Sequence, residues 1–192
     1  ASTNSTSPSK ELKCIIDRGA YYNWSVRAND SQQSFGDWAE HRNLSIKAFL
    51  SLTTANSQVN FSGIGLNQWN DTSDDTPRPL VLRNDGNAYT NITITATDLW
   101  PSNINPTTNY QFKIDNVTAT GENASYSASL STVSYTAFPD FMSFCGTCYK
   151  IVELNYTDAT DSVEIDINVS VPADEDPGTR GSVITFTGAL AE

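Results

Sequence analysis

Residues 163–171 are Val-Glu-Ile-Asp-Ile-Asn-Val-Ser-Val, and this stretch decides the fold class. Every second side chain is aliphatic, and those between are polar or charged. Because successive side chains of a β-strand point to opposite faces of a sheet, this alternation predicts a strand with one face in the core and the other towards solvent. A proline-glycine loop at 172–178 and the segment Val183–Thr187, rich in β-branched and aromatic residues, follow it, and they predict a turn and a closing strand.

The same alternation recurs upstream in several segments, and turn-forming stretches at Asp17–Ala20 and Arg83–Asn87 separate some of them. At least eight strands at this spacing predict an all-β fold, a single Ig-like or jelly-roll β-sandwich. The stretch 121–150 has no regular pattern and stays unassigned. The alternating apolar residues of the other predicted strands are Leu12, Cys14 and Ile16; Tyr22, Trp24 and Val26; Leu44, Ile46, Ala48, Leu50 and Leu52; Val59 and Phe61; Leu80 and Leu82; Tyr89, Ile92, Ile94 and Ala96; and Tyr110, Phe112 and Ile114.

The length, charge and hydropathy of the chain limit its domain number and its possible partners. Its 192 residues fit one domain, or one domain with an arm. With 11 basic and 22 acidic residues the net charge is −11, which would repel a phosphate backbone, so we expect no nucleic-acid partner. No run approaches the roughly 18 apolar residues of a membrane-spanning helix, so we expect no membrane span. The start at Ala1, without Met or an apolar leader, suits a secreted chain whose signal peptide has been removed.

The N-glycosylation pattern Asn-x-Ser/Thr is more frequent than composition explains. It includes 11 of the 18 asparagines, whereas 44 Ser and Thr in 192 residues predict about 4. A chain rich in Asn, Ser and Thr also generates such sequons by composition alone, but we interpret the excess as glycosylation. Sugars require asparagines that reach solvent, and they imply an extracellular location. We expect them at Asn4, Asn23, Asn29, Asn43, Asn60, Asn70, Asn91, Asn116, Asn123, Asn155 and Asn168.

Two segments resemble signatures of archaeal surface β-sandwich domains. The first is Leu80–Ile94, which passes through Asn-Asp-Gly-Asn between two strands, and the second is Val169–Thr179, with Val-Pro-Ala-Asp followed by Pro-Gly-Thr before the last strand. With the sequons and a polar N-terminal arm, the chain is similar to TasA/camelysin-type fibre subunits and to archaeal bundling pili and threads. The segments cover about half of the chain, and their motifs also occur in other extracellular sandwich modules.

This resemblance implies a sandwich that lacks one strand and receives it from a neighbouring subunit. Residues 1–18 would be the donor arm and residues 19–192 the sandwich, with Leu12, Cys14 and Ile16 as the plugs that enter the neighbour. The implied function is a structural subunit of a helical, extracellular filament on the cell surface, with identical subunits as partners. The alternatives are that residues 11–17 form an ordinary strand of their own subunit, or that the chain is an S-layer-like or carbohydrate-binding surface module.

The three cysteines leave several pairings open. Cys145 and Cys148 stand in Cys-Gly-Thr-Cys, and Cys14 lies far from them in sequence. A secreted chain favours a disulfide, either within the close pair or from Cys14 to one of its members. Together with His41, the only histidine, they could also form a Cys₃His zinc site, but a single Cys-x-x-Cys pair is weak evidence and we assign no metal.

Other candidate sites are weaker. Four tryptophans could stack on sugars, although tryptophans of sandwiches usually lie in the core. No nucleophile-base set and no paired carboxylates are recognisable, so we expect no enzyme activity. We expect no cofactor; Ca²⁺ could bind acidic loops, but solvated turns are the better interpretation of them. The acidic loops contain Asp71, Asp74 and Asp75; Asp158 and Asp161; and Asp174, Glu175 and Asp176, and the tryptophans are Trp24, Trp38, Trp69 and Trp100.

Overall fold

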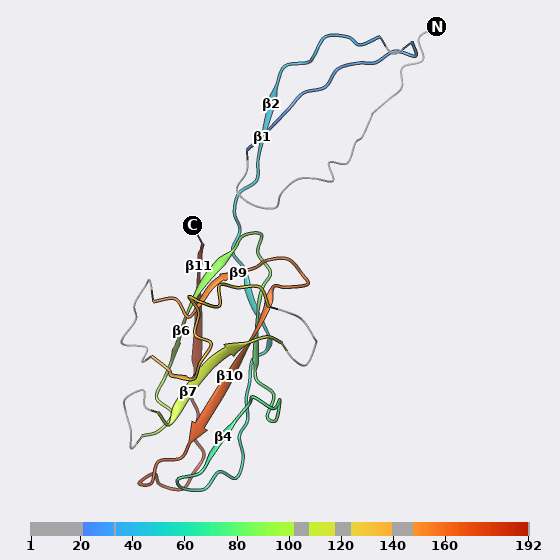
Figure 1. The fold of residues 1–192 in the computed structure, drawn as a ribbon. Coiled ribbons are helices and arrows are strands. Elements are labelled where there is room, and N and C mark those ends of the chain that lie inside the picture. Colours follow the sequence, from blue (N-terminus) through green and yellow to red (C-terminus); the bar gives the residue numbers. More distant parts are fainter. Residues whose placement is uncertain (1–20, 33, 102–107, 118–123, 140–147, 192) are drawn as a thin grey trace. The chain divides into compact units, whose positions relative to one another are not determined.

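The structure is a computed structural model that describes residues 21–32, 34–101, 108–117, 124–139 and 148–191 (Figure 1). Within these ranges all regular structure is β, which confirms the predicted all-β class. Accordingly, none of the described residues belongs to a helix able to cross a membrane. The chain divides into two compact units, Ala1–Ala48 and Phe49–Glu192.

The second unit is a β-sandwich of a six-stranded and a three-stranded sheet. In the larger sheet the order is β3-β5-β10-β7-β8, and β4 also pairs with β10. In the smaller sheet the order is β11-β6-β9. The strands of this unit are β3 (Leu52–Asn56), β4 (Trp69–Asp71), β5 (Leu80–Asn84), β6 (Thr90–Ala96), β7 (Tyr110–Asp115), β8 (Thr136–Ala137), β9 (Ile151–Leu154), β10 (Ser162–Ser170) and β11 (Ile184–Leu190).

The stretch that decided the fold class forms β10, the central strand of the larger sheet. One side of β10 pairs with β7, and the other pairs first with β5 and then with β4, all antiparallel. Val163, Ile165 and Ile167 are buried in the core, as the alternation predicts. The six-stranded sheet is therefore built around the clearest strand in the sequence.

The core lies between the inner faces of the two sheets. From the larger sheet Phe112 and Leu82 are fully buried, and from the smaller sheet Ile92, Ile94 and Ile151 are fully buried. Phe138 packs between rings of the larger sheet, with its centroid 4.3 Å from that of Tyr110 and 4.7 Å from that of Phe112. The burial of such side chains is the main favourable term in the stability of a sandwich.

The predicted turn at Arg83–Asn87 is the corner where the chain passes from one sheet to the other. Asn84 is fully buried there, and its Nδ2 donates to the carbonyl oxygens of Ala88 (2.9 Å) and Leu154 (3.1 Å). Its Oδ1 accepts the backbone N–H of Gly86 at 3.1 Å. One amide side chain thus holds the turn and fastens it to β9, which explains how a polar group is tolerated in the core.

The first unit differs from the prediction in two ways. A continuous half-buried strand was predicted through Leu44–Leu52, but β2 (Arg42–Ser45) ends at Ser45, near the start of this stretch, and β3 begins only at Leu52, in the other unit. Strand β1 (Tyr21–Trp24) pairs only with β2 among the described residues, and no second sheet covers this pair there. Trp24 is therefore 44% exposed, although alternation alone predicted a buried face. The compact unit that contains the sandwich begins at Phe49.

Candidate functional site

A groove of about 1150 Å³ opens on the interior of the sandwich. Strand β3 is an edge of the larger sheet and β11 is an edge of the smaller sheet, and residues of both strands line the groove. Its floor is apolar and belongs to the core. The lining from the strands and their ends includes Leu80, Tyr110, Ile167, Val169, Val171, Ile184 and Phe186.

The two edge strands approach each other at one point. A Cβ placed on Gly188 of β11 would lie 2.9 Å from Leu52 Cδ1 and 3.2 Å from Leu50 Cδ2, so the backbone of β11 passes close to side chains of β3 and the residues before it. Ile184 and Phe186, further towards the start of β11, line the groove and are only partly buried. The groove therefore lies beside the first residues of β11.

Two loops form the walls of the groove. Residues 57–66 form one wall, where Val59, Phe61 and Ile64 pack against the core and Leu66 is 51% exposed at the rim. At the end of this loop Asn67 donates its N–H to the carbonyl oxygen of Val171 at 2.9 Å. This bond fastens the loop to the residue that follows β10.

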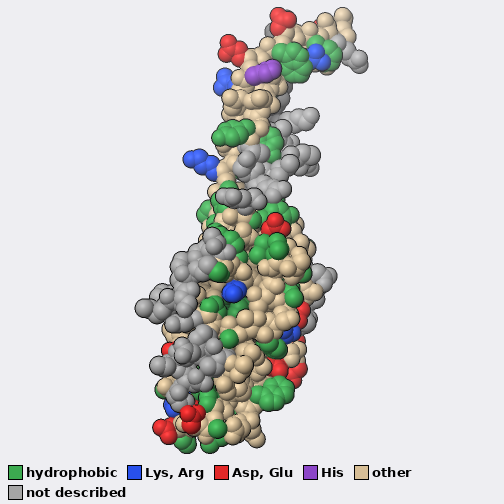
Figure 2. All heavy atoms as spheres, turned by 60° about the vertical axis from the view of Figure 1, so that its left-hand side comes forward, with side chains coloured by type: hydrophobic (Ala, Val, Ile, Leu, Met, Phe, Trp, Pro, Cys, Tyr) green, Lys and Arg blue, Asp and Glu red, His purple; other side chains and the backbone are tan. Residues whose placement is uncertain are grey.

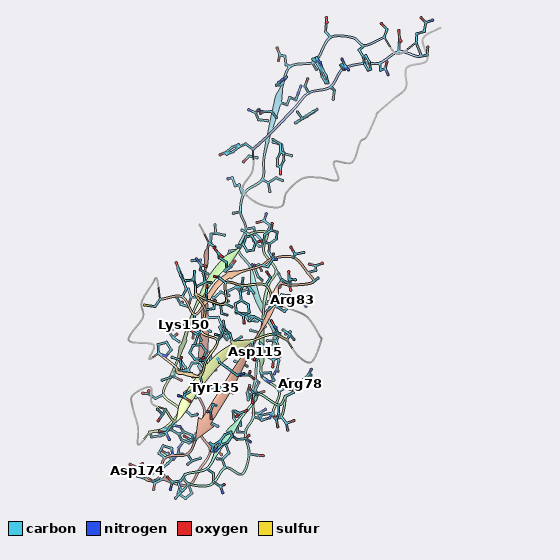
Figure 3. All side chains as sticks on the ribbon, in the orientation of Figure 1. Arg78, Arg83, Asp115, Tyr135, Lys150 and Asp174 are labelled. Carbon is cyan, nitrogen blue, oxygen red and sulfur yellow. The ribbon has the colours of Figure 1, made fainter. Side chains whose placement is uncertain are left out.

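The second wall is residues 175–183, shaped by an ion pair. The buried Glu175 accepts from Arg180 Nε at 2.6 Å, and Arg180 Nη2 donates to the carbonyl oxygen of Asp176 at 2.9 Å. The side chain of Arg180 is only 24% exposed, so water weakens this ion pair little. The charge-assisted hydrogen bond therefore fixes the course of the loop. Asp174, at the end of the sandwich where β10 ends (Figure 3), and Asp176 are both exposed.

The outer edge of β11 presents backbone groups beside the groove. Thr97 donates its N–H to the carbonyl oxygen of Val183, and Ala191 donates to that of Tyr89, so the odd-numbered residues of β11 face β6. In an antiparallel pair the residues between them point their N–H and C=O groups to the other side. The groups of Ile184 and Phe186 therefore point to the free edge, which receives no backbone partner within the described part of the chain. An edge of this kind can accept a further strand.

The floor of the groove is a site of low polarity. Burial raises the pKa of Tyr110 to about 12, even though a hydrogen bond with Ser182 acts in the opposite direction. Tyr110, Val169 and Ile167 are each less than a tenth exposed, and they lie at the bottom of the groove. The arrangement suits an apolar occupant that also supplies backbone hydrogen bonds.

A cluster of charged and polar side chains, separate from the groove, lies on the outer face of the larger sheet. Lys113 of β7 stands opposite Asp166 of β10, and its Nζ lies 3.2 Å from Asp166 Oδ2 and 3.0 Å from Asp115 Oδ2. Thr72 Oγ1 donates to Asp166 Oδ1 at 2.8 Å and accepts the N–H of Ile167 at 2.9 Å. The ring of Tyr135, 5.5 Å from Lys113 Nζ, covers the cluster (Figure 3 labels Tyr135 and Asp115).

The charges of this cluster stabilise one another. Burial alone would lower the pKa of Lys113, but hydrogen bonds to Asp115 and Asp166 raise it well above its usual value. Burial alone would raise the pKa of Asp115, but hydrogen bonds from Lys113 and from the Asn116 amide hold it below its usual value. Every charge has a partner, so the cluster stabilises the junction of β4, β7 and β10 and provides no reactive group.

Sequence reasoning missed this cluster because alternation predicts that Glu164 and Asp166 face solvent. Both are buried, with 3% and 2% exposure. The opposite charges of Lys113 and Asp166 on two predicted strands were the available evidence. These charges predict an ion pair only when it is known that the two strands are neighbours in the sheet.

The predicted donor plugs Leu12, Cys14 and Ile16, the disulfide candidate Cys145, and Asn4 and Asn123 lie outside the described residues. Cys148 is described without the other two cysteines, so the pairing of the cysteines remains a prediction. His41 is exposed in the first unit. The described residues contain no group of three or more His, Cys, Asp or Glu side chains that could hold a metal ion.

The acidic loops use some of their carboxylates within the chain. Asp71 Oδ1 accepts the N–H of Ser73 at 2.9 Å, and Asp74 Oδ1 accepts that of Thr76 at 3.0 Å. Asp161 is buried, with Oδ1 3.5 Å from Arg83 Nε. These contacts account for part of each acidic loop without a bound cation.

The expectation that the tryptophans lie in the core holds for one of the four. Trp100 is 7% exposed, and its Nε1 donates to the carbonyl oxygen of Asn109 at 3.2 Å. Trp24, Trp38 and Trp69 are 44%, 60% and 67% exposed. The reason is local: two of them belong to the hairpin of the first unit, and Trp69 lies on the short strand β4.

The nine described sequon asparagines all reach solvent to some extent. The side chains of Asn70, Asn91 and Asn155 accept backbone N–H groups through Oδ1. These hydrogen bonds do not use Nδ2, the atom to which an N-linked sugar is attached. Asn60 borders the groove, and the other eight do not line it. Asn23, Asn29, Asn43, Asn60 and Asn116 are exposed, and Asn70, Asn91, Asn155 and Asn168 are partly buried.

Comparisons with family models, with curated proteins and with solved structures found no match to this chain.

Proposed function

We propose that this chain is a structural subunit of an extracellular, N-glycosylated filament, in which the leading segment of one copy fills the groove of the next. The observation that carries the proposal is the groove itself, which has an apolar floor of core side chains and lies beside the free edge of β11. A strand placed there would pair with β11 through its backbone and would bury every second side chain against the core.

The leading segment has the pattern that such a groove requires. Residues 10–18 are Lys-Glu-Leu-Lys-Cys-Ile-Ile-Asp-Arg, in which Leu12, Cys14 and Ile16 share one face of an extended strand. Burying a large aliphatic side chain contributes about 1.5–3 kcal/mol. Two such side chains and a cysteine, with backbone hydrogen bonds along β11, would hold neighbouring subunits together without a covalent bond.

The positions of the sequons support the glycosylated part of the proposal. None of the nine described sequon asparagines is buried, whereas Asn84, which is not part of a sequon, is fully buried. Eight of the nine leave the groove clear. Sugars at these sites would coat the subunit and restrict protein contacts to the uncoated remainder, which includes the groove. Mass spectrometry of tryptic peptides from the native protein tests the occupancy of each site.

The assembly mechanism is tested by two neighbouring substitutions in the leading segment. Ile16→Asp places a carboxylate where an inward plug is proposed, and Ile15→Asp places the same group on the opposite face of the strand. We expect Ile16→Asp to weaken assembly at least about a hundredfold, since a desolvated carboxylate without a partner is strongly disfavoured in an apolar site. Ile15→Asp should assemble nearly as well as the unmodified chain. Electron microscopy and sedimentation of the purified protein give the readouts.

Two further outcomes decide against the proposal. If both substitutions weaken assembly equally, the alternating plug register is wrong. If the unmodified chain stays monomeric, shows no filaments and binds no peptide of residues 8–18, the chain is better explained as an S-layer-like or carbohydrate-binding surface module.

A further inference from the structure

The hairpin of the first unit exposes an unusual amount of apolar surface. Tyr21 is 85% exposed, Val26 57%, Phe35 54% and Trp38 60%. An isolated two-stranded hairpin has no interior in which to bury such groups and is at best marginally stable in water. Figure 2 shows hydrophobic side chains at its surface. This surface is suited to contact with another molecule.

Three side chains of this hairpin form an ordered stack. The Arg27 guanidinium lies 3.7 Å from the ring centroid of Phe35 and 4.6 Å from that of Trp38. Backbone bonds hold the two segments together, because Ala39 donates to the Val26 carbonyl oxygen at 2.8 Å and Gly36 to that of Ala28 at 3.0 Å. We call Arg27, Phe35 and Trp38 the hairpin patch. Tryptophan and arginine residues held in place before binding often dominate the energy of an interface.

The charge of the chain indicates what this patch binds. Residues 1–48 contain six basic and five acidic residues, a net charge of +1, and residues 49–192 contain five basic and seventeen acidic residues, a net charge of −12. Two sandwich units therefore repel each other, whereas the first unit meets no such repulsion from the sandwich of another copy. A second copy of this chain is the partner that both the apolar surface and the charge favour.

Because the hairpin follows the leading segment in the chain, it must lie near the groove that the leading segment fills. This step rests on the proposed function. With Ile16 seated in the groove of a neighbour, Tyr21 follows five residues later and lies within about 18 Å of it, and Arg27 of the patch follows eleven residues later and lies within about 40 Å. The rim of the groove offers exposed apolar side chains at Leu66 (51%) and Val183 (67%), with the exposed Asp176 beside them. We propose that the hairpin patch binds the surface around the groove of the copy that receives the leading segment, as a second contact between subunits.

The test compares one pair of exposed aromatic residues with a single exposed aromatic residue elsewhere in the full chain. Phe35→Ser with Trp38→Ser removes the rings of the patch but leaves the leading segment and the groove unchanged. Trp69→Ser is the control, because Trp69 is at least as exposed as Phe35 and Trp38, lies on β4 of the sandwich and does not line the groove. We expect the double variant to raise the critical concentration for assembly at least about tenfold, as loss of a hot-spot aromatic does, and Trp69→Ser to leave it unchanged.

Two measurements separate failure of this inference from failure of the proposed function. A labelled peptide of residues 8–18 is titrated into the Ile16→Asp monomer, with and without the double substitution, and should bind both equally. If the unmodified chain assembles and the peptide binds, but the double variant assembles at the unmodified critical concentration, the hairpin contact is wrong and the groove remains. If there is neither assembly nor peptide binding, both ideas fail. A lower melting temperature of the double-variant monomer would show that the patch packs within its own chain, which also overturns the inference.

Discussion

At the scale of single residues, Gly86 shows how closely the corner between the two sheets is packed. A Cβ at this position would lie 2.5 Å from the carbonyl oxygen of Phe49 and 3.0 Å from Asn84 Oδ1. The Phe49 oxygen is held in place, since it accepts the N–H of Asn87 at 3.0 Å. We expect Gly86→Ala to lower the free energy of unfolding by about 1–3 kcal/mol, as overpacking does elsewhere.

Urea denaturation of the full chain measures this effect. Gly181→Ala is the control, because a Cβ there would have no heavy atom within 4 Å. Equal stability of the two variants would mean that the corner rearranges without cost, and that the contacts of Asn84 do not fix it.

At this scale the sequence predicted the turn but not its role. The pair Asp85-Gly86 inside Arg83–Asn87 indicates a tight turn, and a turn is present. That Asn84 is buried and bonded to Leu154 could not be predicted, because β9 is brought to it only by the pairing of distant strands. Local sequence specifies backbone conformation, whereas the partners of a buried polar group depend on the whole fold.

At the scale of elements, the cluster that joins β4, β7 and β10 makes stability depend on pH. The pKa of Asp115 is lower in the folded chain than its ordinary value near about 4. The group therefore stabilises the fold above that pH, and the contribution is lost as the pH falls through the folded pKa. We expect Asp115→Asn to melt at a lower temperature than the unmodified chain at pH 6, with a difference that shrinks below about pH 4.

Melting curves followed by circular dichroism between pH 2 and 7 test this. Asp158→Asn, in an exposed turn after β9, serves as the control for a change of net charge alone. A difference between Asp115→Asn and the unmodified chain that stays constant down to pH 2 would contradict the role given to the Lys113 contact.

The strands themselves were predictable to different degrees. The regions of β6, β7, β10 and β11 follow directly from alternation, because each carries buried or partly buried apolar side chains that pack in the core. The alternation through Leu44–Leu52 was misleading, since β2 has no covering layer in the described chain and all four of its residues are exposed. The groove itself could not be predicted from the sequence, because its walls come from loops whose course depends on contacts such as the Glu175–Arg180 ion pair.

At the scale of the whole molecule, charge decides how copies of the chain can approach one another. The net charge of −11 is concentrated in residues 49–192, while the first 48 residues are close to neutral. An end-to-end contact between the first unit of one copy and the sandwich of another avoids most of the repulsion that a contact between two sandwiches would meet. The same distribution that permits a filament should therefore keep separate filaments apart.

This gives a prediction for the proposed filaments. At neutral pH and low salt we expect them to stay dispersed, and as the pH falls to about 4 we expect them to associate laterally, because the carboxylates of the sandwich become protonated. Turbidity and electron microscopy measure the association. Salt at pH 7 is the control, since about 1 M shortens the screening distance to roughly 3 Å and should produce the same bundles without protonation. Bundling in acid that salt fails to reproduce would show that a specific protonated contact, and not the overall charge, holds the filaments together.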